Sequence, residues 1–391
     1  MDRSATVPEA IAGPQRASHR FAPASDAALA LADGRVFRGR GFGATANASG
    51  EAVFTTTMTG YQEVCTDPSF RGQIVCMTYP LIGNYGVNAD DDESRRPWIS
   101  GLVVREWSDK PSNWRSTGTI DDYLKDAGIP GISGVDTRAL TRHIRSVGDT
   151  RAVLVRGAQE TSDENLVALA QDAPLPGEVD VVGEVRETGE SVYGPEGNAI
   201  HVVILDCGVK RNIVRSLVNR GVRVTVVPYG TSYDRIAELR PDGVIVSPGP
   251  GDPANLDSGL DLVRSLLADQ RPYFGICLGH QLLARAIGAG TDKLKFGHRG
   301  GNQPVRDERT GKVTITAQNH SYRVIDESIP VDGGWQVALR NLNDNSVEGL
   351  WHDTLPVLSV QFHPEASPGP SDSNGMFDQF LDLIQSRSAA D

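Results

Sequence analysis

The sequence predicts an α/β protein in two parts, a β-rich α+β domain followed by a doubly wound, mostly parallel sheet. Residues 27–110 contain short β-branched or apolar runs separated by glycine, proline and aspartate, which is typical of strands. Residues 201–287 alternate strand-like and helix-like segments with short connections, which is typical of right-handed βαβ units. Residues 172–198 between them are turn-rich and polar, as expected of a linker.

These observations divide the chain into four parts. Residues 1–26 mix arginines with acidic residues and hold no long apolar run, so we expect a disordered extension, not a signal or transit peptide. The β-rich domain is expected over residues 27–171 and the linker over residues 172–198. The second domain then covers residues 199–388.

In the first domain, Asp33-Gly34 inside the run 28–36 is a two-residue hairpin signal. A helix is expected at residues 135–147, where apolar side chains share one face. Another is expected at residues 166–170, because the preceding residues have the spacing of a capping box. Further strands are expected at residues 51–57, 73–78 and 98–106.

In the second domain, ligands are expected beyond the carboxyl ends of the parallel strands, so the residues that follow each strand matter most. Strands are predicted at residues 201–207, 222–228, 243–247, 272–277 and 357–362, and helices at residues 210–220, 233–240, 259–269 and 278–287.

Composition excludes several classes of protein. The 391 residues carry a formal net charge of −12, which disfavours nucleic acid as a partner because its binders need a positive surface. No run approaches the 18 or so apolar residues of a membrane helix, so no membrane partner is expected. The four cysteines lack paired spacing, which suits a reduced, cytoplasmic protein rather than a disulfide framework.

The chemistry is expected to centre on Cys277. It lies between Gly275 and Gly279, after a strand and before a helix, which is the cysteine version of the nucleophile elbow G-x-S-x-G. The glycines allow a sharp turn that leaves the central side chain projecting, and the helix N-terminus favours a thiolate. The alternative is a buried structural cysteine at a turn.

A nucleophile of this kind needs oxyanion donors and a base. The glycines of the loop 248–253 allow its backbone to approach a ligand closely. His363 follows a strand, and Glu365 two positions on can orient it. His320 is the rival base, whereas His280 lies too close to Cys277 in sequence. A zinc site at Cys277 and His280 is disfavoured because no second ligand pair has suitable spacing.

Residues 275–281, the loop 248–253 and residues 363–365, in that order, resemble a class I glutamine amidotransferase. Within that class, the N-terminal half of the chain and two segments of the second half resemble the small subunit of carbamoyl-phosphate synthase. The segments that carry it are residues 57–63, 66–70, 79–84, 134–141, 207–212 and 297–302.

The resemblance implies that the chain hydrolyses L-glutamine to glutamate and ammonia. Ammonia would pass to a large subunit that makes carbamoyl phosphate for arginine and pyrimidine synthesis. ATP and magnesium would be bound by that partner, so no cofactor is expected in this chain, in agreement with the missing P-loop motif.

The resemblance also assigns roles to residues. Cys277 would be the nucleophile, His363 the acid and base, and Glu365 its orienting group. Ser321 stands where the family usually has glycine, so a positive φ there would be strained, and Thr57 stands where serine is common. The residues expected to bind glutamine are Thr57, Gly249, Gly251, Leu278, Gln281, Asn319, Ser321 and Tyr322.

Two other functions stay open from the sequence. The chain could be the glutaminase of another synthase, such as those that make anthranilate or GMP, although the first half counts against this. It could also be a regulator with an amidotransferase fold and no turnover, although Cys277, His363 and Glu365 are all present.

Overall fold

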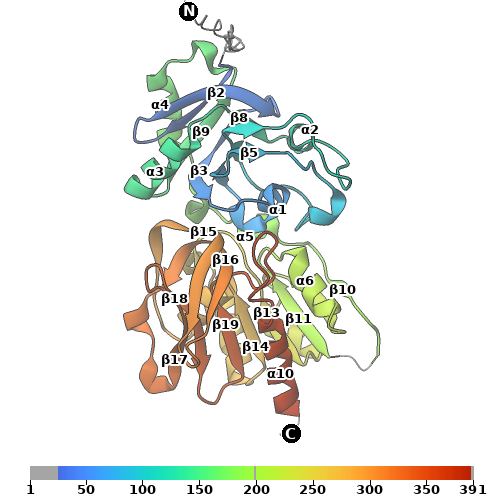
Figure 1. Ribbon diagram of the computed structural model, residues 1–391. Helices are drawn as coiled ribbons and strands as arrows, with labels where there is room; N and C mark the ends of the chain where they lie inside the picture. Colours follow the sequence, from blue (N-terminus) through green and yellow to red (C-terminus); the bar gives the residue numbers. More distant parts are fainter. Residues whose placement is uncertain (1–24, 198–199, 389–391) are drawn as a thin grey trace, which may run out of the picture.

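The computed structural model describes residues 25–197 and 200–388, and Figure 1 shows these as two units, one above the other. The predicted extension at residues 1–26 therefore lies almost wholly outside the described residues. Asp26 is described and well held, because its carboxylate accepts a hydrogen bond from the Gly41 N–H at 2.6 Å.

The N-terminal unit is built around a closed β-barrel with the strand order β1-β2-β8-β6-β4-β3-β9. Closing the sheet leaves no unpaired edge, and apolar side chains fill its interior and pack beneath its helices. The strands are β1 (Ala27–Leu31), β2 (Val36–Gly43), β3 (Ala48–Thr55), β4 (Gln73–Met77), β6 (Gly101–Val103), β8 (Pro130–Ser133) and β9 (Thr150–Arg156).

The local predictions for this unit are confirmed in most elements. Strands β1 and β2 form the expected hairpin, with Gly34 at φ 101 in its turn. Helix α3 (Thr137–Val147) buries Leu140 and Ile144, but Val147 is exposed. Helix α4 (Asp163–Gln171) begins after Ser162, whose hydroxyl accepts from the Asn165 N–H. The short elements that complete this unit around the barrel are α1 (Tyr61–Thr66), η1 (Pro68–Phe70), β5 (Leu81–Ile82), η2 (Ala89–Asp91), β7 (Glu106–Trp107), α2 (Ile120–Asp126) and η3 (Ala158–Glu160).

The C-terminal unit contains the predicted doubly wound sheet, in the order β10-β12-β11-β13-β14-β19. All neighbouring pairs are parallel except β10 with β12. Helices α6 and α10 pack on one face, and α7, α8 and α9 on the other. The elements are β10 (Ser191–Tyr193), β11 (His201–Asp206), α6 (Arg211–Val218), β12 (Arg223–Pro228), α7 (Tyr233–Glu238), β13 (Gly243–Val246), α8 (Asp257–Ala268), β14 (Tyr273–Ile276), α9 (Leu278–Ala286), β19 (Val357–Val360) and α10 (Met376–Ser388).

A second, four-stranded antiparallel sheet in this unit was not predicted. Its order is β16-β15-β17-β18, and the long pair β15 and β16 reaches up to the N-terminal unit in Figure 1. The pairing of β15 with β16 contains two register shifts, which break the alternation that would have marked these strands. The strands are β15 (Thr291–Asp307), β16 (Val313–Val324), β17 (Trp335–Asn341) and β18 (Val347–His352).

The segment 172–198 is more structured than the predicted linker. It contains the short helices η4 (Pro176–Glu178) and α5 (Val182–Val185). Its strand β10 (Ser191–Tyr193) pairs with β12 and forms one edge of the parallel sheet. Part of this segment therefore belongs to the second unit.

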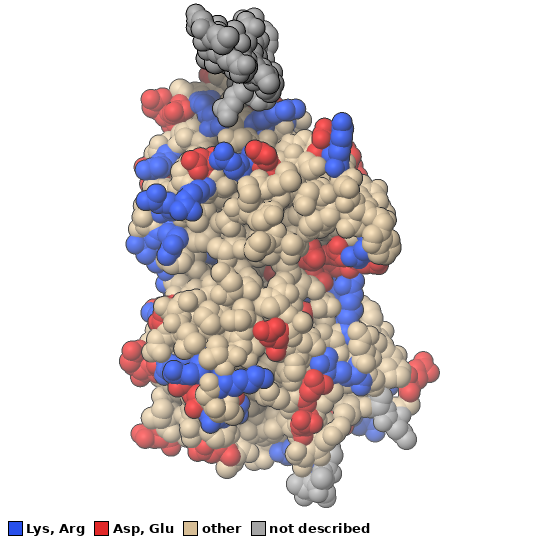
Figure 2. All heavy atoms as spheres, viewed as in Figure 1, with Lys and Arg blue, Asp and Glu red and all other residues tan. Residues whose placement is uncertain are grey.

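Charges of both signs are spread over the face shown in Figure 2, although basic side chains gather at one side of the N-terminal unit. Helix α3 exposes Arg138, Arg142 and Arg145 to solvent. Among the described residues, no helix is long and apolar enough to cross a bilayer.

Candidate active site

Cys277 lies at the sharp turn between β14 and α9. Its backbone is strained, with φ 51 and ψ −101, a conformation rare for a residue with a side chain. A Cβ on Gly275 would lie 2.7 Å from the Gly279 carbonyl, and one on Gly279 would lie 2.2 Å from the Val246 carbonyl oxygen. Both glycines are therefore required sterically, as the sequence predicted.

The structure brings His363 and Glu365 to this cysteine. The Nδ1 atom of His363 lies 2.7 Å from Glu365 Oε1, and both side chains are at least 97% buried. Nε2 is buried without a hydrogen-bond partner among the described residues, so it is the nitrogen available to the thiol and its substrate. The arrangement of the three residues matches that of a nucleophile, a base and an orienting carboxylate.

Electrostatics favour a protonated imidazole at His363. Burial lowers its pKa, but the Glu365 carboxylate and the interaction with Cys277 outweigh burial and raise the pKa to about 10. Burial in turn raises the pKa of Glu365, whereas Lys210 and His363 lower it to about 2. The site therefore holds an imidazolium beside a carboxylate at neutral pH.

Lys210 forms a buried ion pair with Glu365. Its Nζ lies 3.1 Å from Glu365 Oε1, and the two side chains are 2% and 0% exposed. Nζ also donates to the carbonyl of Ala366, and Asn212 Nδ2 donates to the carbonyl of Glu365. These contacts hold Glu365 in place, because a buried carboxylate without its Lys210 partner would carry an uncompensated charge.

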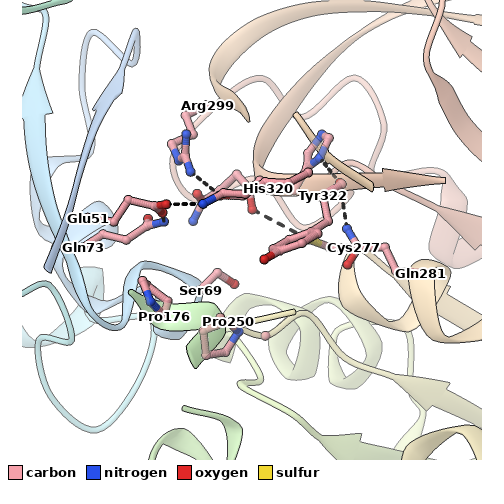
Figure 3. Close-up of a pocket in the computed structure, with 16 residues that line it drawn as sticks. Glu51, Ser69, Gln73, Pro176, Pro250, Cys277, Gln281, Arg299, His320 and Tyr322 are labelled. Atoms are coloured by element: carbon pink, nitrogen blue, oxygen red, sulfur yellow. Dashed lines mark hydrogen bonds and ion pairs between the residues drawn. The ribbon is translucent and has the colours of Figure 1, made fainter. Parts of the chain in front are cut away.

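A pocket opens over the thiol between the two units, and Figure 3 shows the side chains that line it. Lys293 and Glu51 form an ion pair at one end, with Nζ 2.5 Å from Oε1. Arg299 beside them pairs with buried Asp149 at 3.2 Å. The pocket is lined by Glu51, Ser69, Gln73, Pro176, Gly177, Gly249, Pro250, Gly251, Cys277, Gln281, Lys293, Arg299, Asn319, His320, Ser321 and Tyr322.

The structure places most of the predicted glutamine-binding residues in this pocket. Gly249 and Gly251 line it, and Gly249 packs so closely that an added Cβ would lie 2.3 Å from the Cys207 carbonyl oxygen. Leu278 is the first residue of α9, so its backbone N–H lies beside the nucleophile. Together these positions suit the backbone donors of an oxyanion hole.

Residues 319–322 of β16 form the opposite wall. The Asn319 carbonyl oxygen lies 3.7 Å from Cys277 Sγ. Gln281 holds this wall, because its Nε2 donates to the Tyr322 carbonyl at 2.9 Å. Ser321 does not have a positive φ, so the strain expected from replacing glycine is absent. Its hydroxyl accepts instead from Arg299 Nη2 at 2.5 Å.

Thr57 lies apart from the other predicted ligands. Its hydroxyl lies 2.9 Å from that of Thr55. It lines a small neighbouring cavity, together with Lys210 and His363, and not the pocket above the thiol. Direct contact between Thr57 and glutamine in that pocket is therefore not supported by this geometry.

The two other histidines near the nucleophile are occupied elsewhere. His280 is fully buried and its Nδ1 lies 3.0 Å from Ser359 Oγ; burial lowers its pKa to about 3. Both ring nitrogens of His320 are bonded, to the Tyr322 carbonyl and to Gln318. Burial and the neighbouring charge of His298 hold the pKa of His320 well below its usual value. His363 is therefore the better placed base.

Comparison with known proteins addresses both units. The family model described as carbamoyl-phosphate synthase small chain, CPSase domain, matches residues 29–154, and that for class-I glutamine amidotransferases matches residues 203–383. The carbamoyl phosphate synthase small chain of Archaeoglobus fulgidus is 49% identical over 92% of this chain and 99% of its own. The small chain of Syntrophotalea carbinolica is 50% identical, with 92% and 98% covered. The pyrimidine-specific small chain of Halalkalibacterium halodurans is also 50% identical, with 92% and 97% covered.

The chain belongs to the carbamoyl phosphate synthase small chain family. This membership makes it a glutamine-hydrolysing small chain with a class I amidotransferase domain. The small-chain relatives match both units, which favours this family over the glutaminases of other synthases.

Some lining residues of this small-chain pocket had no role in the sequence analysis. Ser69 and Arg299 belong to segments that carried the resemblance, residues 66–70 and 297–302, but nothing local marks them as part of a pocket. Glu51 lies in a strand of the barrel. Their common place depends on how the two units meet, which no spacing in the sequence encodes.

Proposed function

We propose that this chain hydrolyses L-glutamine to glutamate and ammonia at Cys277, and that the ammonia passes to a large subunit. The observation that carries the proposal is the buried arrangement of Cys277, His363 and Glu365 beneath a polar pocket. Such a constellation is suited to acyl transfer through a covalent intermediate.

In the first half of the reaction, the Cys277 thiolate attacks the carboxamide carbon of glutamine. The carbonyl oxygen gains the negative charge, and the N–H groups of Leu278 and of the loop at Gly249 stabilise it. The His363 imidazolium gives its proton to the leaving nitrogen, so that ammonia departs and a glutamyl thioester remains. The raised pKa of His363 supports this acid role.

In the second half, neutral His363 removes a proton from water, which attacks the thioester carbon. The carbon–sulfur bond breaks, and glutamate and the thiolate are released. Glu365 holds the imidazole in the tautomer needed for both halves, since it occupies Nδ1. Gln281, Asn319, Ser321 and Tyr322 are proposed to bind the substrate through polar groups that match an amino acid without adding net charge.

The partner is proposed to be a carbamoyl phosphate synthase large subunit in the cytoplasm. It would use bicarbonate and two ATP with magnesium to make carbamoyl phosphate, which feeds arginine and pyrimidine synthesis. The family membership supports such a partner, and this chain would then need no cofactor of its own.

The test is glutamine-dependent ammonia release by the purified chain, alone and with its large subunit, bicarbonate and MgATP. We expect release that rises strongly with the partner. Cys277→Ser should abolish glutamine-dependent synthesis by the complex and leave ammonia-dependent synthesis intact. Absence of release in both conditions would instead favour a regulator without turnover, and loss of ammonia-dependent synthesis would make Cys277 structural.

A further inference from the structure

A carboxylate of the N-terminal unit contacts the wall that faces the thiol. Asp67 follows helix α1 and is 3% exposed. Its Oδ2 accepts a hydrogen bond from Asn319 Nδ2 at 2.9 Å, between residues 252 positions apart. The carbonyl oxygen of the same Asn319 lies 3.7 Å from Cys277 Sγ. Asn319 therefore contacts both Asp67 and the nucleophile.

Asp67 is itself held rigidly. It caps the short helix η1, and its Oδ1 accepts from the Ser69 N–H at 2.9 Å. Ser69 lines the pocket above the thiol. Both carboxylate oxygens are thus used, one to shape the pocket wall on the barrel side and one to hold the wall on the β16 side. Because the contact is buried, removing the carboxylate would leave the Asn319 amide without its partner.

Asp67 also lies near Lys210, the residue that forms an ion pair with the carboxylate of Glu365. Burial disfavours the charged form of Lys210, but the carboxylates of Glu365, Asp67 and Glu93 outweigh it and raise the Lys210 pKa. The negative charge of Asp67 therefore helps to keep Lys210 protonated, and protonated Lys210 pairs with Glu365. Asp67 of the barrel unit therefore acts on the site in two ways, on Cys277 through Asn319 and on Glu365 through Lys210.

We propose that Asp67 is a positioning residue for glutamine hydrolysis, which holds Asn319 against Cys277 from the N-terminal unit. The inference rests on the proposed function. It makes the N-terminal unit part of the hydrolytic machinery through a contact different from the one predicted for Thr57. Misplacing a group beside the reacting atoms by about 1 Å can cost on the order of 10²-fold in rate.

The test uses the full chain bound to its large subunit and measures kcat and KM for glutamine hydrolysis. Asp67→Ala should lower kcat/KM by about 10- to 100-fold. Asn319→Asp should be at least as damaging, because it places two buried carboxylates against each other. Adding Asp67→Asn to Asn319→Asp restores one donor and one acceptor in reversed order, so the double variant should recover at least tenfold over Asn319→Asp.

Folding is separated from positioning by two further measurements. The fraction of Cys277 labelled by iodoacetamide, located by peptide mass spectrometry, gives the number of intact sites, and kcat is expressed per intact site. Thermal unfolding reports whether each variant is folded. The matched control is Glu184→Gln, which removes a carboxylate that also joins the barrel unit to the segment after it, 2.6 Å from Arg71, but is 43% exposed. It should leave kcat and KM unchanged.

The outcomes separate this inference from the proposed function. If the wild-type complex does not hydrolyse glutamine, the proposed function fails. If the wild type is active and Asp67→Ala matches it per intact site, the inference is wrong. A double variant no more active than Asn319→Asp would also overturn it, because the pair would then have no direct coupling. A loss confined to the number of intact sites would assign Asp67 to folding alone.

Discussion

At the scale of single residues, the strained backbone of Cys277 is the local feature most closely tied to chemistry. A non-glycine residue with positive φ costs on the order of 1–3 kcal/mol and persists only where its surroundings enforce it. Here β14 and α9 are buried on both sides of the turn, and the Cys277 N–H donates to the Val360 carbonyl at 2.8 Å. The packing of β14 and α9 and this hydrogen bond to β19 therefore hold Cys277 in its strained conformation.

Ser321 shows how a departure from a family pattern can be compensated. Replacing it with the usual glycine should destabilise the protein by about 2 kcal/mol, since a charge-assisted bond from Arg299 is lost and glycine weakens a strand. Urea unfolding would measure this. Ser191→Gly on the edge strand β10 is the control, because it should report only the backbone cost of about 0.5–1 kcal/mol. Equal effects of both changes would show that the Arg299 bond adds nothing.

The raised pKa of His363 predicts a pH dependence of stability. The pKa of His363 is about 10 in the folded protein, whereas that of an ordinary imidazole is 6.5, so the folded state binds the extra proton between these pH values. The stabilisation from protonated His363 is therefore complete below pH 6.5 and is lost as the pH rises toward 10. The difference in unfolding free energy between wild type and His363→Asn should shrink from pH 6.5 to 10. A constant difference over that range would contradict a raised pKa.

At the scale of elements, the sharp turn between β14 and α9 depends on glycine, because the backbones of β13, β14 and α9 approach one another too closely there for a side chain. Gly279→Ala should destabilise the protein by about 1–3 kcal/mol through overpacking, because the new Cβ would lie 2.2 Å from the Val246 carbonyl oxygen. It should also reduce glutamine hydrolysis by displacing Cys277. The control is Gly189→Ala, where an added Cβ meets nothing within 4 Å. Both effects are measured by urea unfolding and by ammonia release.

The elements of the parallel sheet could be predicted because buried parallel strands have a strong apolar pattern and clear turns between them. The pair β15 and β16 could not. Residues 297–302 hold three glycines and several polar side chains, and two register shifts interrupt the pairing. These strands are recognised by their partners rather than by their own side chains.

At the scale of the whole molecule, buried and half-buried polar pairs join the two units around the pocket. Asp149 of the barrel unit pairs with Arg299, Glu51 pairs with Lys293, and Asp67 accepts from Asn319. The Asp149 and Arg299 side chains are each 1% exposed, so the charges depend on each other in a medium of low dielectric.

Asp149→Ala should therefore destabilise the protein by about 3–5 kcal/mol, because it leaves the Arg299 guanidinium buried and uncompensated. Urea unfolding is the measurement. Glu238→Ala, which removes one partner of an exposed pair with Arg235, should change the unfolding free energy little. An equally small change in unfolding free energy for Asp149→Ala would mean that water reaches Arg299 and that the two units are not tightly packed against each other there.

The sequence by itself marked Cys277, His363 and Glu365 as the candidate reacting residues, because the elbow and the residues that follow a buried strand are local patterns. It also determined the parallel sheet, whose period and turns lie within short segments. Only the tertiary structure decided that Thr57 lines a cavity separate from the pocket above the thiol, that Ser321 is unstrained, and that Asp67 meets Asn319. Those contacts join residues far apart in the chain, and their geometry follows from the packing of one folded unit against another.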